Sequence, residues 1–353
     1  MSQNTRLSIA PSPHTSSPVG TRNLMLDVLI ALIPALGIGV YFFGPRVITL
    51  CLVSVLGCEF FEWIYRKLMK KSNTAGDLSA VVTGVLLAFC LPATIPYWTV
   101  LIGDLFAMVV AKQFYGGLGK NFINPALAGR AFLFSYPVLM TTWVKPGSQF
   151  WVGLGSTADA VTSATPLAAL HKGILPQAAV STGLLEKAYT LKDMFIGNVG
   201  GCIGEVSALM LLLGGAYLVV RGVIRLRIPV SFIGTVAVLT FLFPKGNPRV
   251  DWMLYNILAG GVMLGAIFMA TDYTTSPVTP KGEIIYGIGC GALTVFIRYF
   301  GAYVEGVSYA ILIMNVCVWL IDKYSSPSRF GVTAEMKKAA KLKAKAAKKG
   351  GEV

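Results

Sequence analysis

The sequence predicts an all-α membrane protein with about ten transmembrane helices. The 353-residue chain is 55% hydrophobic and only 13% charged, with a mean hydropathy of +0.67. Soluble proteins carry about a quarter charged residues, so this composition excludes an ordinary soluble domain. Long apolar runs recur along the chain, and basic residues gather at alternate ends of these runs. Together these observations indicate a polytopic helical bundle.

Ten apolar runs approach the length of about 17–25 residues that crosses a bilayer. They lie at 24–44, 46–65, 78–95, 97–115, 124–144, 198–220, 228–244, 252–271, 283–301 and 304–322. Residues 1–23 form a polar cytoplasmic segment without the apolar centre of a signal peptide, and 323–353 form a basic tail. The runs therefore define one transmembrane domain over 24–322.

The charge pattern predicts the orientation of the bundle. Basic residues follow every even-numbered run, from Arg66 after the second to Lys323 after the tenth. Short cytoplasmic loops carry an excess of Lys and Arg, so both termini are expected in the cytoplasm. The loop 145–197 follows the fifth run and is expected on the extracytoplasmic side. It is the only long loop predicted, and such loops are usually functional or disordered.

A weak similarity between the two halves of the sequence suggests two inverted five-helix repeats. Pro96 precedes Gly103 by seven residues, and Pro280 precedes Gly287 by seven residues. The predicted topology brings these two blocks into the membrane from opposite sides. Inverted repeats with broken helices are typical of proteins that bind small molecules or ions near the midplane.

Several functional classes are disfavoured by composition. The net charge of +14 concentrates in short loops and the tail, so it does not indicate nucleic-acid binding. The six cysteines lie in apolar runs and form no CxxC pair, so neither an iron–sulfur nor a zinc framework is expected. The presence of only two histidines disfavours a haem or a histidine-bound metal, and no metal site is predicted.

A hydroxyl-rich stretch lies in the long loop, over residues 159–167. It offers the hydroxyl groups of Thr162, Ser163 and Thr165. Pro166 restricts Thr165 to an extended backbone, which is expected to present its side chain outward. From the residues alone, this is either an accessible site or an ordinary loop.

Two polar segments between the runs could support a ligand. In 112–130, glycines allow a close approach of the backbone to a bound group, and Asn and Gln amides could read the edge of a heterocycle. Asn124 and Pro125 can cap and begin the next helix. The segment 271–282 adds hydroxyl groups. Neither segment is a Walker or dinucleotide motif, and plain turns are the alternative reading.

Two acidic residues lie deepest in the apolar runs, Asp104 and Glu205. A carboxylate in hydrocarbon costs several kcal/mol unless it is paired or hydrated. These residues either line an ion or proton path or pair with basic residues such as Arg130 and Arg298.

Motifs spread over residues 10–325 carry a family resemblance. They are SPH at 12–14, LPATIPYW at 91–98, YGGLGKN at 115–121, NPALAGR at 124–130, TPL at 165–167, TTSP at 274–277 and EGVSYA at 305–310. With them the chain resembles the D subunit of Rnf ion-translocating oxidoreductases. That subunit is similar in turn to the B subunit of the sodium-pumping NADH:quinone reductase, whose longer N-terminal extension this chain lacks.

The resemblance implies a flavoprotein. In this family FMN is joined through its phosphate to a threonine in a motif Asp-x-x-Ser/Thr-Gly-Ala-Thr, and a flavin transferase attaches it. The matching positions are Asp159, Thr162, Ser163, Ala164 and Thr165, with Ser163 in place of the usual glycine. Thr165 is therefore the expected acceptor.

The resemblance further implies a non-covalent riboflavin in the membrane domain. Its expected surroundings are 112–130 and 272–282, with Lys112, Asn121, Asn124 and Thr274 as candidate contacts.

The resemblance also implies a complex with the A, B, C, E and G subunits of the Rnf system in the bacterial inner membrane. That complex couples electron transfer between ferredoxin and NAD to the movement of Na⁺ or H⁺. The chain would position and tune the flavins, with no catalytic residue of its own.

Three alternatives stay open from the sequence. One is the B subunit of the sodium-pumping reductase. Another is an inverted-repeat transporter without a cofactor. The third is a passive membrane scaffold for partner subunits.

Overall fold

The computed structural model describes residues 20–72, 74–144, 146–147, 165–181, 184–185, 187–301 and 304–326. These residues are helical or irregular and contain no β-strand. The α-helices are α1 (Thr21–Phe43), α2 (Arg46–Leu68), α3 (Ser79–Phe89), α4 (Tyr97–Leu105), α5 (Pro125–Leu133), α6 (Pro137–Met140), α7 (Pro166–His171), α8 (Leu191–Ile196), α9 (Ala208–Val220), α10 (Arg227–Leu242), α11 (Arg249–Leu258), α12 (Val262–Leu264), α13 (Pro280–Phe300) and α14 (Val307–Ser325). A 3₁₀ turn, η1 (Ala75–Asp77), precedes α3, and two π-helical segments, η2 (Phe106–Gln113) and η3 (Gly265–Met269), continue α4 and α12.

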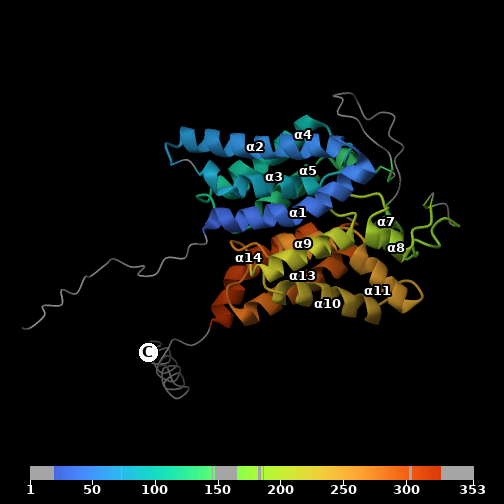
Figure 1. Ribbon diagram of the computed structural model, residues 1–353. Coiled ribbons are helices and arrows are strands. Elements are labelled where there is room, and N and C mark those ends of the chain that lie inside the picture. Colours follow the sequence, from blue (N-terminus) through green and yellow to red (C-terminus); the bar gives the residue numbers. More distant parts are fainter. Residues whose placement is uncertain are drawn as a thin grey trace, which may run out of the picture.

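The helices form two halves that follow the order of the chain. Figure 1 shows α1 to α5 on one side and α9 to α14 on the other. Within the halves α2 packs on α3 and α10 packs on α13, while α1 contacts α9 and α5 contacts α14 between them. The short helices α7 and α8 lie at one end of the bundle, and the start of α1 and the end of α14 lie at the other (Figure 1).

The prediction of a helical, multi-pass membrane protein is confirmed. Among the described residues four helices are long and apolar enough to cross a membrane, namely α1, α2, α13 and α14. A fifth candidate joins α11 to 262–269 through a bend of 63°. The apolar helices α3, α9 and α10 are shorter. Ten crossings and inverted repeats therefore stay predictions, because several predicted runs contain broken rather than continuous helices.

One break explains how an acidic residue reaches the interior. The irregular segment 197–207 lies against the end of α3, where the Ile203 and Gly204 N–H groups donate to the Leu91 and Phe89 carbonyls at 3.0 and 2.9 Å. These bonds satisfy carbonyls that the end of a helix leaves unpaired. A Cβ atom on Gly204 would collide with the Phe89 ring. The close approach places the next residue, Glu205, among buried side chains.

Helices of the structure begin or lie within two segments that the sequence marks as polar. α1 begins at Thr21, inside the predicted polar segment 1–23. The long loop 145–197 contains α7 and α8, each capped by a threonine side chain, Thr165 and Thr190. Residues 1–19 and 327–353 lie outside the described residues.

We expect Gly84→Ala to destabilise the packing of α3 on α2. A Cβ atom at Gly84 would lie 2.8 Å from Val55 Cα and 2.9 Å from the Ser54 carbonyl oxygen, and both atoms belong to backbone. Overpacking of this kind costs about 1–3 kcal/mol, so thermal unfolding in detergent, followed by tryptophan fluorescence, should begin several degrees lower.

Gly37→Ala is the matched control, because nothing lies within 4 Å of a Cβ atom at that helical position. Alanine also favours a helix over glycine, so this variant should unfold at or slightly above the wild-type temperature. Equal unfolding temperatures for the two variants would contradict the close packing.

Candidate functional site

Thr165 lies directly before α7 and caps it. Its backbone is extended, with φ −78° and ψ 153°, as Pro166 predicts, and its hydroxyl accepts a bond from the Ala168 N–H at 3.4 Å. The prediction of an outward-facing side chain is wrong in part. Capping turns the hydroxyl toward the helix, and Thr165 is half-buried on the wall of a cavity. The other motif positions, Asp159, Thr162, Ser163 and Ala164, lie outside the described residues.

This cavity, which we call the Thr165 cavity, joins the loop helices to the interior. Its walls include Thr165, Pro166 at the start of α7, Met194 of α8, Glu205, the end of α11 and its break at 258–260, and Glu305 before α14. The free space is about 30 Å³, which is room for about one water molecule. The hydroxyl of Thr165 and two carboxylates therefore share one small, partly polar space.

Arg130 of α5 organises the buried end of this cavity. One guanidinium nitrogen, Nη1, donates to Glu205 Oε1 at 2.9 Å and to Ser308 Oγ at 3.0 Å. The other, Nη2, donates to the Glu305 carboxylate and to Cys202 Sγ, the latter at 3.3 Å. One buried cation thus connects α5, the segment 197–207 and the start of α14.

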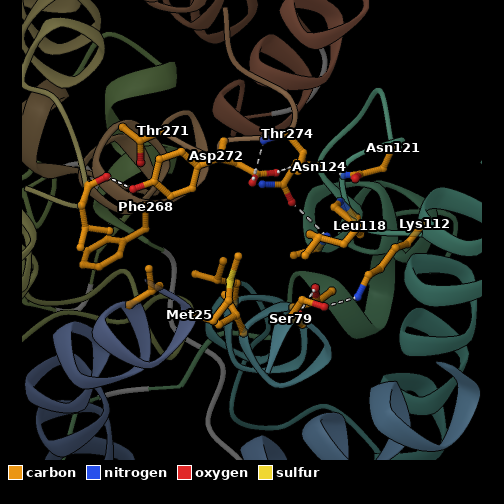
Figure 2. Close-up of a pocket in the computed structure, with 18 of the residues that line it drawn as sticks. Met25, Ser79, Lys112, Leu118, Asn121, Asn124, Phe268, Thr271, Asp272 and Thr274 are labelled. Carbon is orange, nitrogen blue, oxygen red and sulfur yellow. Dashed lines mark hydrogen bonds between the residues drawn. The ribbon is translucent and has the colours of Figure 1, made fainter. Parts of the chain in front are cut away.

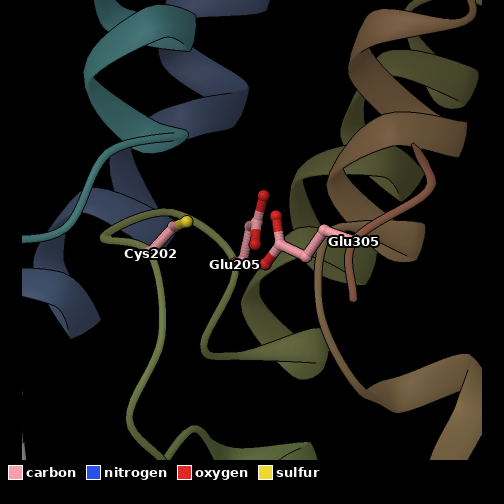
Figure 3. A group of neighbouring side chains, drawn as sticks. All are labelled: Cys202, Glu205 and Glu305. Carbon is pink, nitrogen blue, oxygen red and sulfur yellow. The ribbon is translucent and has the colours of Figure 1, made fainter. Parts of the chain in front are cut away.

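The side chains around Arg130 have the spacing of metal ligands but already hold a cation. Cys202 Sγ and the carboxylate oxygens of Glu205 and Glu305 lie within 4.8 Å of one another, and Figure 3 shows the two carboxylates facing each other. Since the Arg130 guanidinium donates to all three groups, we assign no metal to them.

Arg298 of α13 has a different role from Arg130. Its guanidinium donates to the Asn256 and Ala259 carbonyls at 2.6 and 2.7 Å. These carbonyls belong to the end of α11, where the helix breaks. Pairing of Glu205 with Arg130 is therefore confirmed. The Arg298 guanidinium instead donates its hydrogen bonds to backbone carbonyls.

Asp104 of α4 lies in a separate polar cluster. Its Oδ1 accepts from Ser54 Oγ at 2.7 Å and from Cys58 Sγ at 3.3 Å. Its buried Oδ2 has no hydrogen-bond partner among the described residues. The hydrogen bonds of Asp104 and Glu205 share no residue, so the structure does not bring these two acidic residues together.

A second cavity, which we call the Lys112 cavity, gathers four residues selected from the sequence. Lys112, Asn121, Asn124 and Thr274 all line it, together with Asp272. Figure 2 shows Lys112 and Ser79 on one side and Asp272 and Thr274 across from them. Most of the remaining wall is apolar and is lined by side chains such as those of Met25, Val82, Leu86 and Phe268.

The two asparagines of this cavity have different tasks. Asn124 caps α5, because its Oδ1 accepts from the Ala126 and Leu127 N–H groups at 3.0 and 3.3 Å, as predicted. Asn121 Nδ2 donates to Thr274 Oγ1 at 3.0 Å. The Asn121 Oδ1 atom is buried without a partner among the described residues, so Asn121 offers a free acceptor for a bound group.

Lys112 is buried rather than lying in a cytoplasmic turn. Its ammonium group donates to Ser79 Oγ at 2.7 Å and to Glu62 Oε2 at 3.1 Å. It belongs to the π-helical segment η2, and such segments often occur at functional sites. Sequence analysis missed Glu62, which also accepts from Gln113 and Thr74 at 2.9 and 2.8 Å. The available signal was that Glu62 and Lys112 end runs two and four on the same predicted side.

Asp272 sets the charge across the Lys112 cavity. Burial raises the pKa of its carboxyl above the ordinary value, although hydrogen bonds from the Thr274 and Thr275 hydroxyls act in the opposite direction. The cavity therefore has an ammonium group on one wall and a carboxyl group of weakened acidity on the other.

Apolar helices with buried charges at their breaks define a multi-pass membrane protein with internal polar sites. Residues 8–331 match the NQR2, RnfD, RnfE family. The chain belongs to this family.

Curated relatives match over nearly their full length. The chain is 45% identical over 337 residues to the D subunit of the Na⁺-translocating ferredoxin:NAD⁺ oxidoreductase complex of Acetobacterium woodii, covering 95% of this chain and 98% of that protein. It is 42% identical to the proton-translocating counterpart of Clostridium ljungdahlii, covering 92% and 96%. The D subunit of the ion-translocating oxidoreductase complex of Stutzerimonas stutzeri is 38% identical, with 89% and 93% covered.

We expect Arg130→Gln to reduce folding severely. It leaves the buried carboxylates of Glu205 and Glu305 without their cation, and breaking a buried ion pair in this way costs about 3–5 kcal/mol. The measurement is the yield of monodisperse protein in detergent. Arg249→Gln, at an exposed position, is the control and should leave the yield unchanged.

A triple variant tests the cause of that loss. Changing Glu205 and Glu305 to Gln together with Arg130→Gln removes all three charges, so yield should partly recover. No recovery would show that Arg130 acts through its shape rather than through charge.

Proposed function

We propose that the chain is the FMN-carrying membrane subunit of an Rnf-type complex, which couples electron transfer between ferredoxin and NAD to Na⁺ or H⁺ translocation. Relatives named as D subunits of ferredoxin:NAD⁺ oxidoreductase complexes support this, since they align over 96–98% of their length. The observation that carries the proposal is the threonine hydroxyl at a cavity bordered by buried charges. The A, B, C, E and G subunits of the Rnf system are the proposed partners, and a flavin transferase attaches the FMN.

Thr165 suits the attachment of FMN through a phosphoester. The reaction requires an accessible hydroxyl, and the Thr165 hydroxyl is half-buried with one long hydrogen bond of 3.4 Å from Ala168. A bound flavin supplies the one- and two-electron chemistry that side chains lack. This chain's part is to position the flavin beside the charges of Arg130, Glu205 and Glu305.

The Lys112 cavity suits a non-covalent riboflavin in its chemistry. Apolar walls fit a ring system, and the unpartnered Asn121 Oδ1 fits a ring N–H donor. Thr274 and Lys112 add polar groups beside it. The free space is about 70 Å³, smaller than the roughly 300–1,000 Å³ of ligand sites. Binding a riboflavin therefore requires wall side chains such as Phe268 to move apart.

The proposed topology has ten crossings and both termini in the cytoplasm. In support, the start of α1 and the end of α14 lie at one end of the bundle, while α7 and α8 lie at the other (Figure 1). Thr165 would then face the extracytoplasmic side of the bacterial inner membrane. One π-helical segment in each half, η2 and η3, supports the two repeats. Asp104 and Glu205 are the proposed polar points of an ion path.

Two other functions are weighed against this one. The family also includes the B subunit of the sodium-pumping NADH:quinone reductase, but the relatives named above are D subunits. A cofactor-free transporter would use the same buried carboxylates, and it predicts colourless protein after co-expression with the flavin transferase.

We expect Thr165→Ala to abolish covalent flavin. After co-expression with the flavin transferase, denatured wild-type protein should fluoresce on a gel and the alanine variant should not, because the acceptor oxygen is gone. Thr165→Ser keeps a hydroxyl and should retain at least part of the signal. Undiminished fluorescence from the alanine variant would place the flavin on another residue.

Asn121→Leu should lower the content of non-covalent flavin about tenfold. Loss of hydrogen bonds to a buried ligand costs about 1–3 kcal/mol, and the measurement is riboflavin released on denaturation per mole of protein. Lys120→Met, at the exposed neighbouring position, is the control, and Thr165→Ala should also keep the released riboflavin. A normal riboflavin content in Asn121→Leu would show that riboflavin does not bind beside Asn121.

A further inference from the structure

An apolar groove, which we call the α9–α10 groove, lies between α9 and α10. Its volume is about 620 Å³, within the range of roughly 300–1,000 Å³ that is typical of ligand sites. Small residues on both helices leave this room, among them Gly215, Ala216 and Gly234. Val220 and Val230 also line the groove and are 86% and 62% exposed, so the groove opens away from the bundle.

A polar cavity, which we call the arginine cavity, adjoins one end of this groove, and Ile224 lines both. Its volume is about 310 Å³, and its walls include the turn 222–225 after α9, residues 276–278 and Glu283. The cavity lies near the end of α14, where the Val278 N–H donates to Asp322 Oδ1 at 3.2 Å. Under the proposed topology, this end of the bundle faces the cytoplasm.

Two arginines share one carboxylate at the arginine cavity. The Nη1 atoms of Arg225 and Arg227 donate to the two oxygens of Glu283 at 3.1 and 2.9 Å. Their side chains are 67% and 44% exposed, and a guanidinium has several N–H donors, so each can donate to a second acceptor. The neighbouring Arg221 pairs with Asp27 at 3.3 Å. Two cations therefore face one carboxylate.

The surrounding backbone also favours an anion. α10 begins at Arg227, and no side chain of the described residues caps it. The unpaired N–H groups and the dipole of this 16-residue helix attract negative charge to its start. The nearest further carboxyl group, that of Asp272, lines the Lys112 cavity instead, across from an ammonium group (Figure 2).

We propose that the α9–α10 groove and the arginine cavity together bind one anionic phospholipid of the cytoplasmic leaflet. The headgroup phosphate accepts charge-assisted hydrogen bonds from Arg225 and Arg227, and an acyl chain lies in the groove. Basic pockets between transmembrane helices on the cytoplasmic side suit such headgroups. A partner helix could cover the groove, but its apolar face would leave the exposed guanidiniums without an anion.

The bound lipid would support a wall of the Lys112 cavity. Four residues line both this cavity and the arginine cavity, namely Val223, Ile224, Thr271 and Tyr273. The Tyr273 hydroxyl donates to the Val223 carbonyl, which connects the segment after η3 to the turn after α9. A headgroup in the arginine cavity therefore contacts the outer side of that wall.

The first test counts the lipids that stay bound to the full-length protein. The protein is reconstituted in nanodiscs of equimolar phosphatidylglycerol and phosphatidylethanolamine, released into detergent and examined by native mass spectrometry. Wild type should retain one phosphatidylglycerol. Arg225→Gln should lower the retained fraction about fivefold, the effect of one arginine near an anionic surface, and it leaves Arg227 for Glu283. Arg249→Gln, at an exposed position outside both cavities, should retain the lipid.

The second test fills the α9–α10 groove. Nothing lies within 4 Å of a Cβ atom at Gly234, so Gly234→Leu should fold normally and lose most of the bound lipid. Gly37→Leu is the matched control, because its Cβ position on α1 is equally free and lies outside the groove. Added phosphatidylglycerol should raise the unfolding temperature of wild type and Gly37→Leu by mass action, but not that of Gly234→Leu.

Several results would overturn the proposal. One is equal retention of the two lipids by wild type, and another is full retention of phosphatidylglycerol by Arg225→Gln and Gly234→Leu. If Gly234→Leu keeps the lipid but no longer copurifies with partner subunits, a partner helix covers the groove. If Arg225→Gln lowers the released riboflavin and leaves lipid unchanged, the arginine cavity belongs to the riboflavin site. Thr165→Ala should retain lipid as wild type does, so a failure of the flavin proposal stays distinguishable.

Discussion

Much of the interior depends on the hydrogen bonds of the Arg130 guanidinium. A buried cation is tolerated only when its donors and charge are matched, and Arg130 finds Glu205, Glu305, Cys202 and Ser308. Glu205, Cys202 and Glu305 come from irregular segments, which no continuous helix holds in place, and Ser308 comes from the first turn of α14. The ion pairs therefore fix where the segment 197–207 and the residues before α14 enter the bundle.

Irregular backbone inside a membrane protein must find internal hydrogen-bond partners. The bend at 90–96 is held by Arg46, which donates to the Ala93 and Ile95 carbonyls at 2.9 and 3.2 Å. The break after α11 is held by Arg298. Buried arginines thus stabilise the breaks, and the Thr165 cavity lies where several breaks meet. The architecture therefore supplies the polar groups that border the proposed flavin site.

The sequence predicted the class of fold and part of the sites. Composition and charge suffice for a helical membrane protein, since the bilayer restricts composition so strongly. Lys112, Asn121, Asn124 and Thr274 do share one cavity. Hydropathy could not separate irregular from helical backbone, so the predicted run 198–220 hid the break that positions Glu205.

The buried position of Glu62 was missed for a similar reason. The π-helical segment η2 carries the buried Lys112 that pairs with it, and a hydropathy pattern does not reveal such a segment. For the same reason, the sequence left open whether Asp104 and Glu205 line a path or pair with basic residues, and only the structure shows that they lie in separate hydrogen-bonded clusters. Long-range pairing of charges needs the three-dimensional arrangement of the breaks.

The central claim is that Thr165 carries a redox group at the wall of a charged cavity. Its most direct test is mass spectrometry of the loop peptide containing Thr165, taken from mature protein purified from its native membrane. The account predicts an adduct with the mass of FMN joined by a phosphoester, with fragmentation locating it on Thr165. An unmodified Thr165 in the assembled complex would contradict the account.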